Sequence, residues 1–146
     1  MLKYIQIFFV MAFVSLLSST LFSADTVESC SKKDAQKAEK LADTAKSWDD
    51  LYRLYKRYHQ CDDGAIAEGF SESVSILLSH SWEQIDKLNK IVVKDNKFKL
   101  FVLKHIDETV PQERLQEIAY LATNKCSSAT KSLCEKIRKR VNELNE

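Results

Sequence analysis

Turn-forming residues are almost absent from this chain, and their scarcity limits the possible fold more than any other feature of the sequence. Among 146 residues there are two glycines, Gly64 and Gly69, and a single proline, Pro111. A sheet protein of this length needs more turn residues to reverse its strands, and alternating apolar and polar runs are missing as well. Apolar residues recur instead at the spacing of three and four that an α-helix produces. We therefore predict an all-α protein.

The helical period divides the chain after Cys30 into about seven short helices. The first covers residues 31–46, is charged and alanine-rich, and has only a narrow apolar stripe, so we expect it to lie across the surface. The later helices are expected to begin at Ser47, at Asp62 or Asp63, at Ser81, after the turn at 94–97, at Thr109 and after the turn at 124–130. Gly69 falls inside a helix, which predicts close approach by a neighbouring helix.

A short segment occurs twice. "SWDDLYRL" begins at Ser47 and "SWEQIDKL" begins at Ser81, and a fainter copy, "PQERLQEI", begins at Pro111. Each serine is a suitable N-cap for a following helix whose tryptophan, Trp48 or Trp82, faces the core. The simplest arrangement is a leading helix followed by three helical hairpins. Either a compact bundle or a short solenoid-like stack would satisfy this pattern.

The repeat also resembles a known helical family in part. The period and the spacing of Trp48, Leu51 and Tyr55 resemble the tetratricopeptide repeat, which is a helical hairpin. Tyr52, however, stands where that family has a glycine, and the second copy lacks both the glycine and the tyrosine of the family pattern. No proline closes either copy, and we do not assign the chain to the family.

The first 24 residues are typical of a secretory signal peptide. A lysine-containing start is followed by an apolar middle and by small residues up to Ala24. The alternative is a retained anchor, since residues 5–22 approach the roughly 20 residues that a membrane span needs. We expect cleavage, which leaves residues 25–146 as one all-helical domain, secreted or periplasmic, with no stable membrane anchor.

All four cysteines follow the predicted signal peptide. An even number in a small exported chain indicates a disulfide framework, and four cysteines allow three connectivities. We favour the local pairs Cys30–Cys61 and Cys126–Cys134, which would stabilise the fold by roughly 3.7 and 2.6 kcal/mol through loop entropy. A zinc site is the rival interpretation, but the sequence has no Cys-x-x-Cys pair. We therefore expect no metal.

Charge argues against two classes of partner. Without the signal peptide, and hence without Lys3, the chain has 21 basic and 21 acidic residues. Nucleic acids and anionic membranes both attract a basic excess, so neither is expected as the main partner.

No catalytic constellation is evident. The segment "GFSES" lacks the final glycine of a nucleophile elbow and no strand precedes it, so Ser71 is expected to face solvent on a helix. His59, His80 and His105 each fall in the last turn of a predicted helix, where the helix dipole favours them. His105 could lie near Asp107 or Glu108, but the pattern is weak as a metal site. We expect no cofactor.

The strongest candidate for a binding site is the turn formed by Asp62, Asp63 and Gly64. One acid is enough to cap the next helix, so the second would be free to meet a cation on a partner. A second candidate is the surface of Tyr52, Arg53 and Lys56, because tyrosine and arginine are frequent in protein interfaces. The same residues could equally cover the margin of the core.

These observations favour a non-enzymatic protein-binding module, such as an inhibitor, an immunity-type neutraliser of an exported toxin or an envelope adaptor. Two alternatives stay open. One is a small hydrolase that uses an acid and a histidine, for example Asp63 with His80. The other is a helical pocket that holds an apolar ligand between Trp48 and Trp82.

Overall fold

The computed structural model describes residues 29–145, and the predicted signal peptide lies outside them. This part of the chain is all-α, as predicted, and contains no strand. Its α-helices are α1 (Lys32–Leu41), α2 (Trp48–Tyr58), α3 (Gly64–His80), α4 (Ile85–Lys94), α5 (Asn96–Lys104), α6 (Gln112–Asn124) and α7 (Lys131–Glu143). Two short 3-10 turns, η1 (His59–Cys61) and η2 (Trp82–Gln84), precede α3 and α4.

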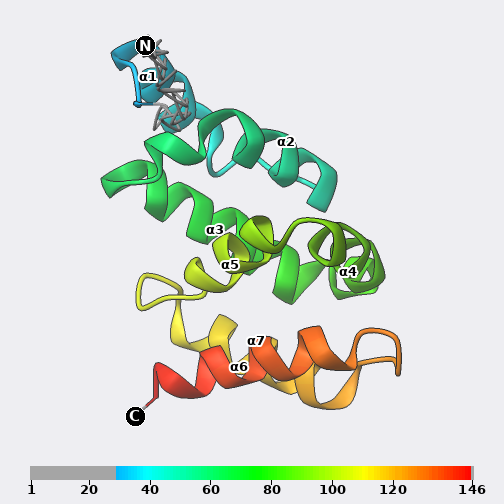
Figure 1. Ribbon diagram of the computed structural model, residues 1–146. Coiled ribbons are helices and arrows are strands. Elements are labelled where there is room, and N and C mark those ends of the chain that lie inside the picture. Colours follow the sequence, from blue (N-terminus) through cyan, green and yellow to red (C-terminus); the bar gives the residue numbers. More distant parts are fainter. Residues whose placement is uncertain (1–28, 146) are drawn as a thin grey trace, which may run out of the picture.

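The helices form a bundle around α3. In Figure 1, α1 and α2 make one level, α3, α4 and α5 the middle level, and α6 with α7 the last. In a solenoid each hairpin would contact only its neighbours. Here α3, from the first hairpin, packs against α6, from the third. The predicted leading helix and three hairpins are present, and of the two arrangements left open, the bundle is correct.

Side-chain caps explain where several helices begin. The side chains of Ser31, Ser47, Asp63 and Asp95 each accept a hydrogen bond from a backbone N–H in the first turn of α1, α2, α3 and α5. Ser47 accepts from Asp50 N at 3.2 Å, as the sequence predicted. The equivalent prediction for Ser81 is wrong, because its side chain caps nothing and the chain first makes the turn η2. The two copies of the repeat therefore begin differently.

Both tryptophans belong to the core, as expected. Trp48 is 1% exposed and Trp82 is 9% exposed. The indole Nε1 of Trp82 donates to the carbonyl oxygen of Lys125 at 3.2 Å, which ties η2 to the end of α6. Aromatic rings fill the middle of the bundle: Phe98 and Phe101 lie with ring centroids 5.1 and 4.8 Å from that of Tyr55.

Gly69 lets α1 approach α3. A Cβ atom at this position would lie 2.9 Å from Ala42 Cβ and 3.3 Å from the backbone nitrogen of Asp43. The close approach predicted from the sequence is therefore confirmed. Ser73, one turn further along α3, donates to the carbonyl oxygen of Ala42 at 2.6 Å and accepts from Ala45 N at 3.3 Å.

Two disulfides close the fold, with the predicted connectivity. Cys30–Cys61 joins the start of α1 to the turn before α3, and Cys126–Cys134 closes the hairpin between α6 and α7. Their Cα atoms are 4.9 and 6.4 Å apart, within the usual range for a disulfide. The structure has no free cysteine among the described residues.

Candidate functional site

A polar cluster lies buried where α3 meets the end of α5. Ser71 and His105 are both 1% exposed. Ser71 Oγ lies 2.9 Å from His105 Nδ1 and 2.6 Å from Asp107 Oδ2, while His105 Nε2 lies 3.1 Å from Asp62 Oδ2. The expectation that Ser71 faces solvent is therefore wrong. Because α3 is the central helix, its polar positions are covered along with its apolar ones.

The hydrogen atoms in this cluster can be assigned by counting donors. Ser71 has one hydroxyl hydrogen, and the carboxylate of Asp107 is its nearest acceptor. Ser71 Oγ is then left to accept from His105 Nδ1–H, while His105 Nε2 faces the carboxylate of Asp62. Both ring nitrogens of His105 thus lie within hydrogen-bonding distance of an oxygen atom, which fixes the orientation of the ring.

The two carboxylates of the cluster have shifted pKa values. Burial raises the pKa of Asp62, but hydrogen bonds from His105 and Lys104 outweigh burial, so the pKa is lowered from its ordinary value. Burial likewise acts to raise the pKa of Asp107, and hydrogen bonds from Ser71 and Thr109 bring it below its ordinary value. The fold therefore favours the charged form of both carboxyl groups.

The cluster has the residue types of a hydrolase triad but not the access that catalysis requires. A serine nucleophile must reach a substrate carbonyl, and the Oγ of Ser71 is buried and bonded within the protein. The predicted alternative pair fails for a different reason. Asp63 caps the start of α3 and His80 ends it, so this 17-residue helix holds them about 25 Å apart. The cluster instead joins three segments of the chain.

The turn at Asp62, Asp63 and Gly64 has a structural explanation for each residue. Asp63 caps α3 by accepting from Gly64 N at 2.8 Å. The sequence suggested that the second acid is free to meet a partner's cation. Asp62 is not, because Lys104 and His105 already bind it. Gly64 has a φ of +51°, a conformation that favours glycine, and a Cβ there would meet nothing within 4 Å. Asp63 is the acid that the turn exposes.

The three residues of the second predicted surface have different surroundings in the structure. Tyr52 is half-buried, and its hydroxyl donates to Asp95 Oδ2 at 3.0 Å while its ring packs edge-on against Phe98. Arg53 forms an ion pair with Asp50 on its own helix. Lys56 is exposed. Tyr52 thus covers the margin of the core and also forms a wall of the groove described next.

A ridge on α4 is flanked by two grooves. We call the exposed residues Lys87, Lys90, Val93 and Lys94 the α4 ridge. The first groove, of about 300 Å³, separates α4 from α2 and is lined by Asp49, Tyr52, Lys87, Lys90, Ile91 and Lys94. The second, of about 330 Å³, reaches from α4 to α7 and is lined by Asn89, Val92, Val93, Asn96, Lys99, Ala129, Ser132, Leu133 and Lys136.

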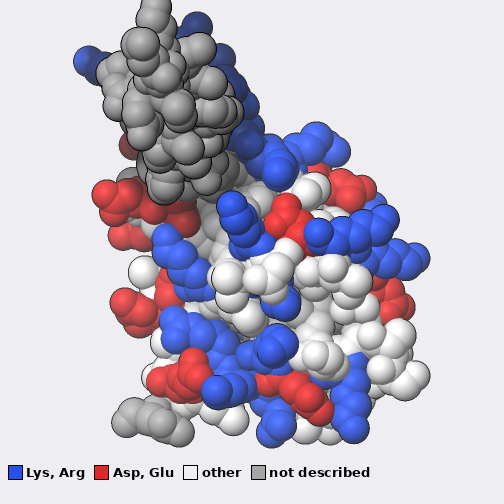
Figure 2. All heavy atoms as spheres, in the orientation of Figure 1, with Lys and Arg blue, Asp and Glu red and all other residues white. Residues whose placement is uncertain are grey.

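The charges along these grooves are largely unpaired. Lys87 forms an ion pair with Asp49 at 2.6 Å. Within residues 29–145, no ion pair is formed by Lys90, Lys94, Lys99 or Lys136. Figure 2 shows lysine and arginine side chains gathered over the region where Figure 1 places α4, with acidic side chains at its margins. The ridge is therefore a positively charged surface with one aliphatic residue, Val93, in it.

Sequence reasoning missed this surface, although a signal for it exists. Residues 87–104 contain six lysines and one acid, Asp95, whereas residues 58–86 contain six acids and no lysine or arginine. The formal charge of zero predicted for residues 25–146 conceals this separation. A running charge count along the chain would have found it.

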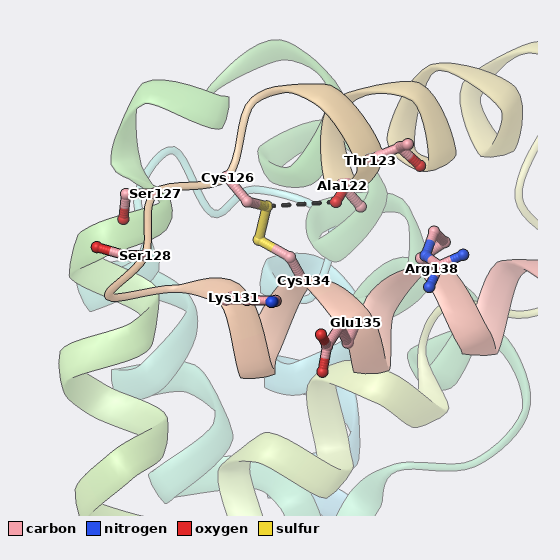
Figure 3. Close-up of a pocket in the computed structure, with 9 residues that line it drawn as sticks. All are labelled: Ala122, Thr123, Cys126, Ser127, Ser128, Lys131, Cys134, Glu135 and Arg138. Carbon is pink, nitrogen blue, oxygen red and sulfur yellow. Dashed lines mark hydrogen bonds between the residues drawn. A yellow bond between two sulfur atoms is a disulfide. The ribbon is translucent and has the colours of Figure 1, made fainter.

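A third cavity lies beside the Cys126–Cys134 disulfide (Figure 3) and has a volume of about 470 Å³. Lys131, Glu135 and Arg138 contribute charged groups of both signs to its lining. This mixture favours neither an anionic nor a cationic ligand, so we rank this cavity below the α4 ridge. Within residues 29–145, no group of three or more His, Cys, Asp or Glu side chains is arranged to hold a metal ion.

Comparison of the chain with protein-family models, with curated proteins and with solved structures found no match. None of the helices in residues 29–145 has both the length and the hydrophobicity needed to cross a membrane.

Proposed function

We propose that this protein is an exported, non-enzymatic protein-binding module that contacts its partner through the α4 ridge. An inhibitor, an immunity-type neutraliser and an envelope adaptor all belong to this class. The observation that carries the proposal is the ridge itself: unpaired lysines and an exposed valine between two grooves.

The composition of the ridge resembles the anatomy of a protein interface. Val93 is 76% exposed, the largest exposed fraction among the exposed large hydrophobic residues of the described chain, and it lines one of the grooves. Apolar side chains line both grooves, half-buried Tyr52 and Ile91 in the first and buried Val92 and Leu133 in the second, and lysines lie beside them. Helices held by disulfides supply the rigid support that lowers the entropic cost of binding.

Export is supported by two features. The first 24 residues have the pattern of a signal peptide, and disulfides persist in oxidising compartments such as the periplasm and the extracellular space.

The alternatives have less support. A hydrolase would need an accessible nucleophile, and Ser71 is buried. An apolar ligand between Trp48 and Trp82 would need space between two side chains that the core already covers. The turn around Asp63 remains a second candidate for partner contact, through the one acid that it exposes.

Site-specific photo-crosslinking tests the proposal. A benzophenone amino acid replaces Val93 in one variant and Tyr120 on α6, which is 54% exposed, in another. Each variant is expressed in the native host and irradiated in intact cells. We expect a discrete crosslinked protein from position 93 that position 120 does not give. The same products from both positions, or none from position 93, would contradict the proposal.

A further inference from the structure

We infer that the partner presents an acidic segment, in which aspartate or glutamate side chains alternate with aliphatic ones, to the groove between α2 and α4. The inference rests on the proposed function and specifies the chemistry of the partner. Its carboxylates would lie on Lys90 and Lys94, and an aliphatic side chain would lie between Tyr52 and Ile91.

The lysines that line this groove lie along one face of α4. Lys87, Lys90 and Lys94 follow the spacing of three and four that places side chains on one face of a helix. Asp49 neutralises Lys87 at one end of the groove, at 2.6 Å. Lys90 and Lys94 remain exposed and form no ion pair with any residue of 29–145. Carboxylates one helical turn apart on a partner would match their spacing.

Two apolar side chains line the groove beside these charges. Ile91 and Tyr52 are both half-buried and pack against the hydrophobic core. The Tyr52 ring is held in place by its hydrogen bond to Asp95 and by Phe98, whose ring centroid lies 4.9 Å away. A wall fixed in this way loses little conformational freedom when an aliphatic side chain packs against it. The groove, at about 300 Å³, has room for side chains rather than for a whole helix.

The lining of the groove favours an acidic protein segment over other anionic partners. Asp49 lines the same groove, so a continuous run of phosphates along it would meet a carboxylate at one end. Nucleic acids offer no aliphatic chain to a narrow cleft between lysines, and the acyl chains of an anionic bilayer lie beneath its charged headgroups rather than between them. A protein segment can place its carboxylates beside the unpaired lysines and an apolar side chain against the apolar lining of the groove. The observations thus favour an acidic peptide.

A peptide probe tests this inference with purified protein. The probe is a fluorescein-labelled helical peptide of alternating Glu and Leu pairs, and binding is followed by fluorescence anisotropy. Lys90→Glu combined with Lys94→Glu reverses the unpaired charges. The matched control combines Lys33→Glu with Lys37→Glu on α1, which reverses two exposed lysines at the same spacing and changes the net charge equally.

We expect the ridge variant to raise the probe's Kd by about tenfold or more, because it replaces attraction by repulsion, and the control to change it by less than about twofold. Raising NaCl from about 50 to about 500 mM should weaken wild-type binding in the same direction. Equal loss in both variants, or no binding by wild type at about 1 mM probe, overturns the inference. So does tighter binding of anionic vesicles or of a DNA oligonucleotide with the same dependence on Lys90 and Lys94.

The two proposals fail in different ways. If crosslinking from position 93 yields a partner but its yield is unchanged by the Lys90 and Lys94 reversals, the protein is a binding module whose partner is not acidic at this groove. If the probe binds through these lysines but position 93 captures no protein, the groove binds acidic peptides while the proposed partner surface is wrong.

Discussion

Asp62 and Asp63 are adjacent and chemically identical, yet they stabilise the fold in different ways. Asp63 caps α3 from an exposed position, whereas the side chain of Asp62 is 9% exposed and binds His105 and Lys104. The sequence predicts that one of the two acids caps α3, but it does not specify the role of Asp62, which meets partners more than 40 residues away along the chain. The two acids should therefore respond differently to substitution.

Asp62→Ala should lower the free energy of unfolding by about 1.5–3 kcal/mol, because it leaves the buried ring of His105 without a charged partner. Asp63→Ala removes only a cap and should cost about 1 kcal/mol. Urea unfolding of both variants measures the difference. Equal losses would mean that the bond from His105 to Asp62 adds nothing beyond an ordinary cap.

Asp107 gives the cluster a dependence on pH. Its pKa is lowered in the folded state, so it stabilises the fold at pH values above the ordinary carboxyl pKa of about 4, and this stabilisation is lost as the pH falls through the folded-state pKa. Asp107→Asn should flatten the decline in stability below about pH 4. Glu108→Gln, on an exposed neighbour, should leave that decline unchanged. Thermal melting at a series of pH values compares the two variants with the wild-type protein. If the melting temperature of Asp107→Asn falls with pH as steeply as that of the wild type, Asp107 does not cause the decline.

At the level of the helix, the central position of α3 buries polar residues that would face solvent on a surface helix. Four of its serines, at positions 71, 73, 75 and 79, are buried, and each donates a hydrogen bond to a neighbouring atom. Small residues with a hydroxyl group allow neighbouring segments to approach while satisfying their own polar atoms. Gly69 contributes to the same close approach.

Gly69→Ala should destabilise the protein by about 1–3 kcal/mol, although alanine is the better helix former, because the new methyl group would collide with Ala42. Ala42→Gly removes the Cβ atom of Ala42, which lies nearest to the new methyl group. Chemical denaturation of the two single variants and the double variant forms a cycle. We expect the double variant to recover part of the loss, and strict additivity would show that the contact with Ala42 is not responsible.

Local patterns predicted much of this fold, and long-range packing decided the rest. Ser47 begins its helix and Trp48 enters the core because both depend on residues within one or two turns. Ser71 was misplaced because its burial depends on helices that contact α3 from several sides. Ser81 was misjudged because a 3-10 turn took the place of the expected cap. The lysines of the α4 ridge can be found by counting charges along the sequence, but the two grooves depend on which helices lie beside α4, and no sequence spacing specifies that.

Across the whole molecule, the two disulfides should contribute unequally. Cys30–Cys61 closes 31 residues and Cys126–Cys134 closes 8. Replacing each pair by serines should cost roughly 3.7 and 2.6 kcal/mol respectively, because the longer loop loses more entropy when it is closed. Denaturant unfolding of the two double variants measures this order. A larger loss from opening the short loop would show that strain or local packing, rather than chain entropy, sets their contributions.

The Cys30–Cys61 link also determines how the protein would extend under mechanical force. Tension applied at the two ends passes through the sulfur bridge, so the 31-residue segment that it closes, which holds all of α1 and α2, cannot lengthen even after those helices unfold. A fully extended residue spans about 3.4 Å, so the bridge withholds on the order of 100 Å of contour length until a reductant opens it. Stretched between its two ends, the oxidised protein would reach its full extension sooner than the same chain with free thiols.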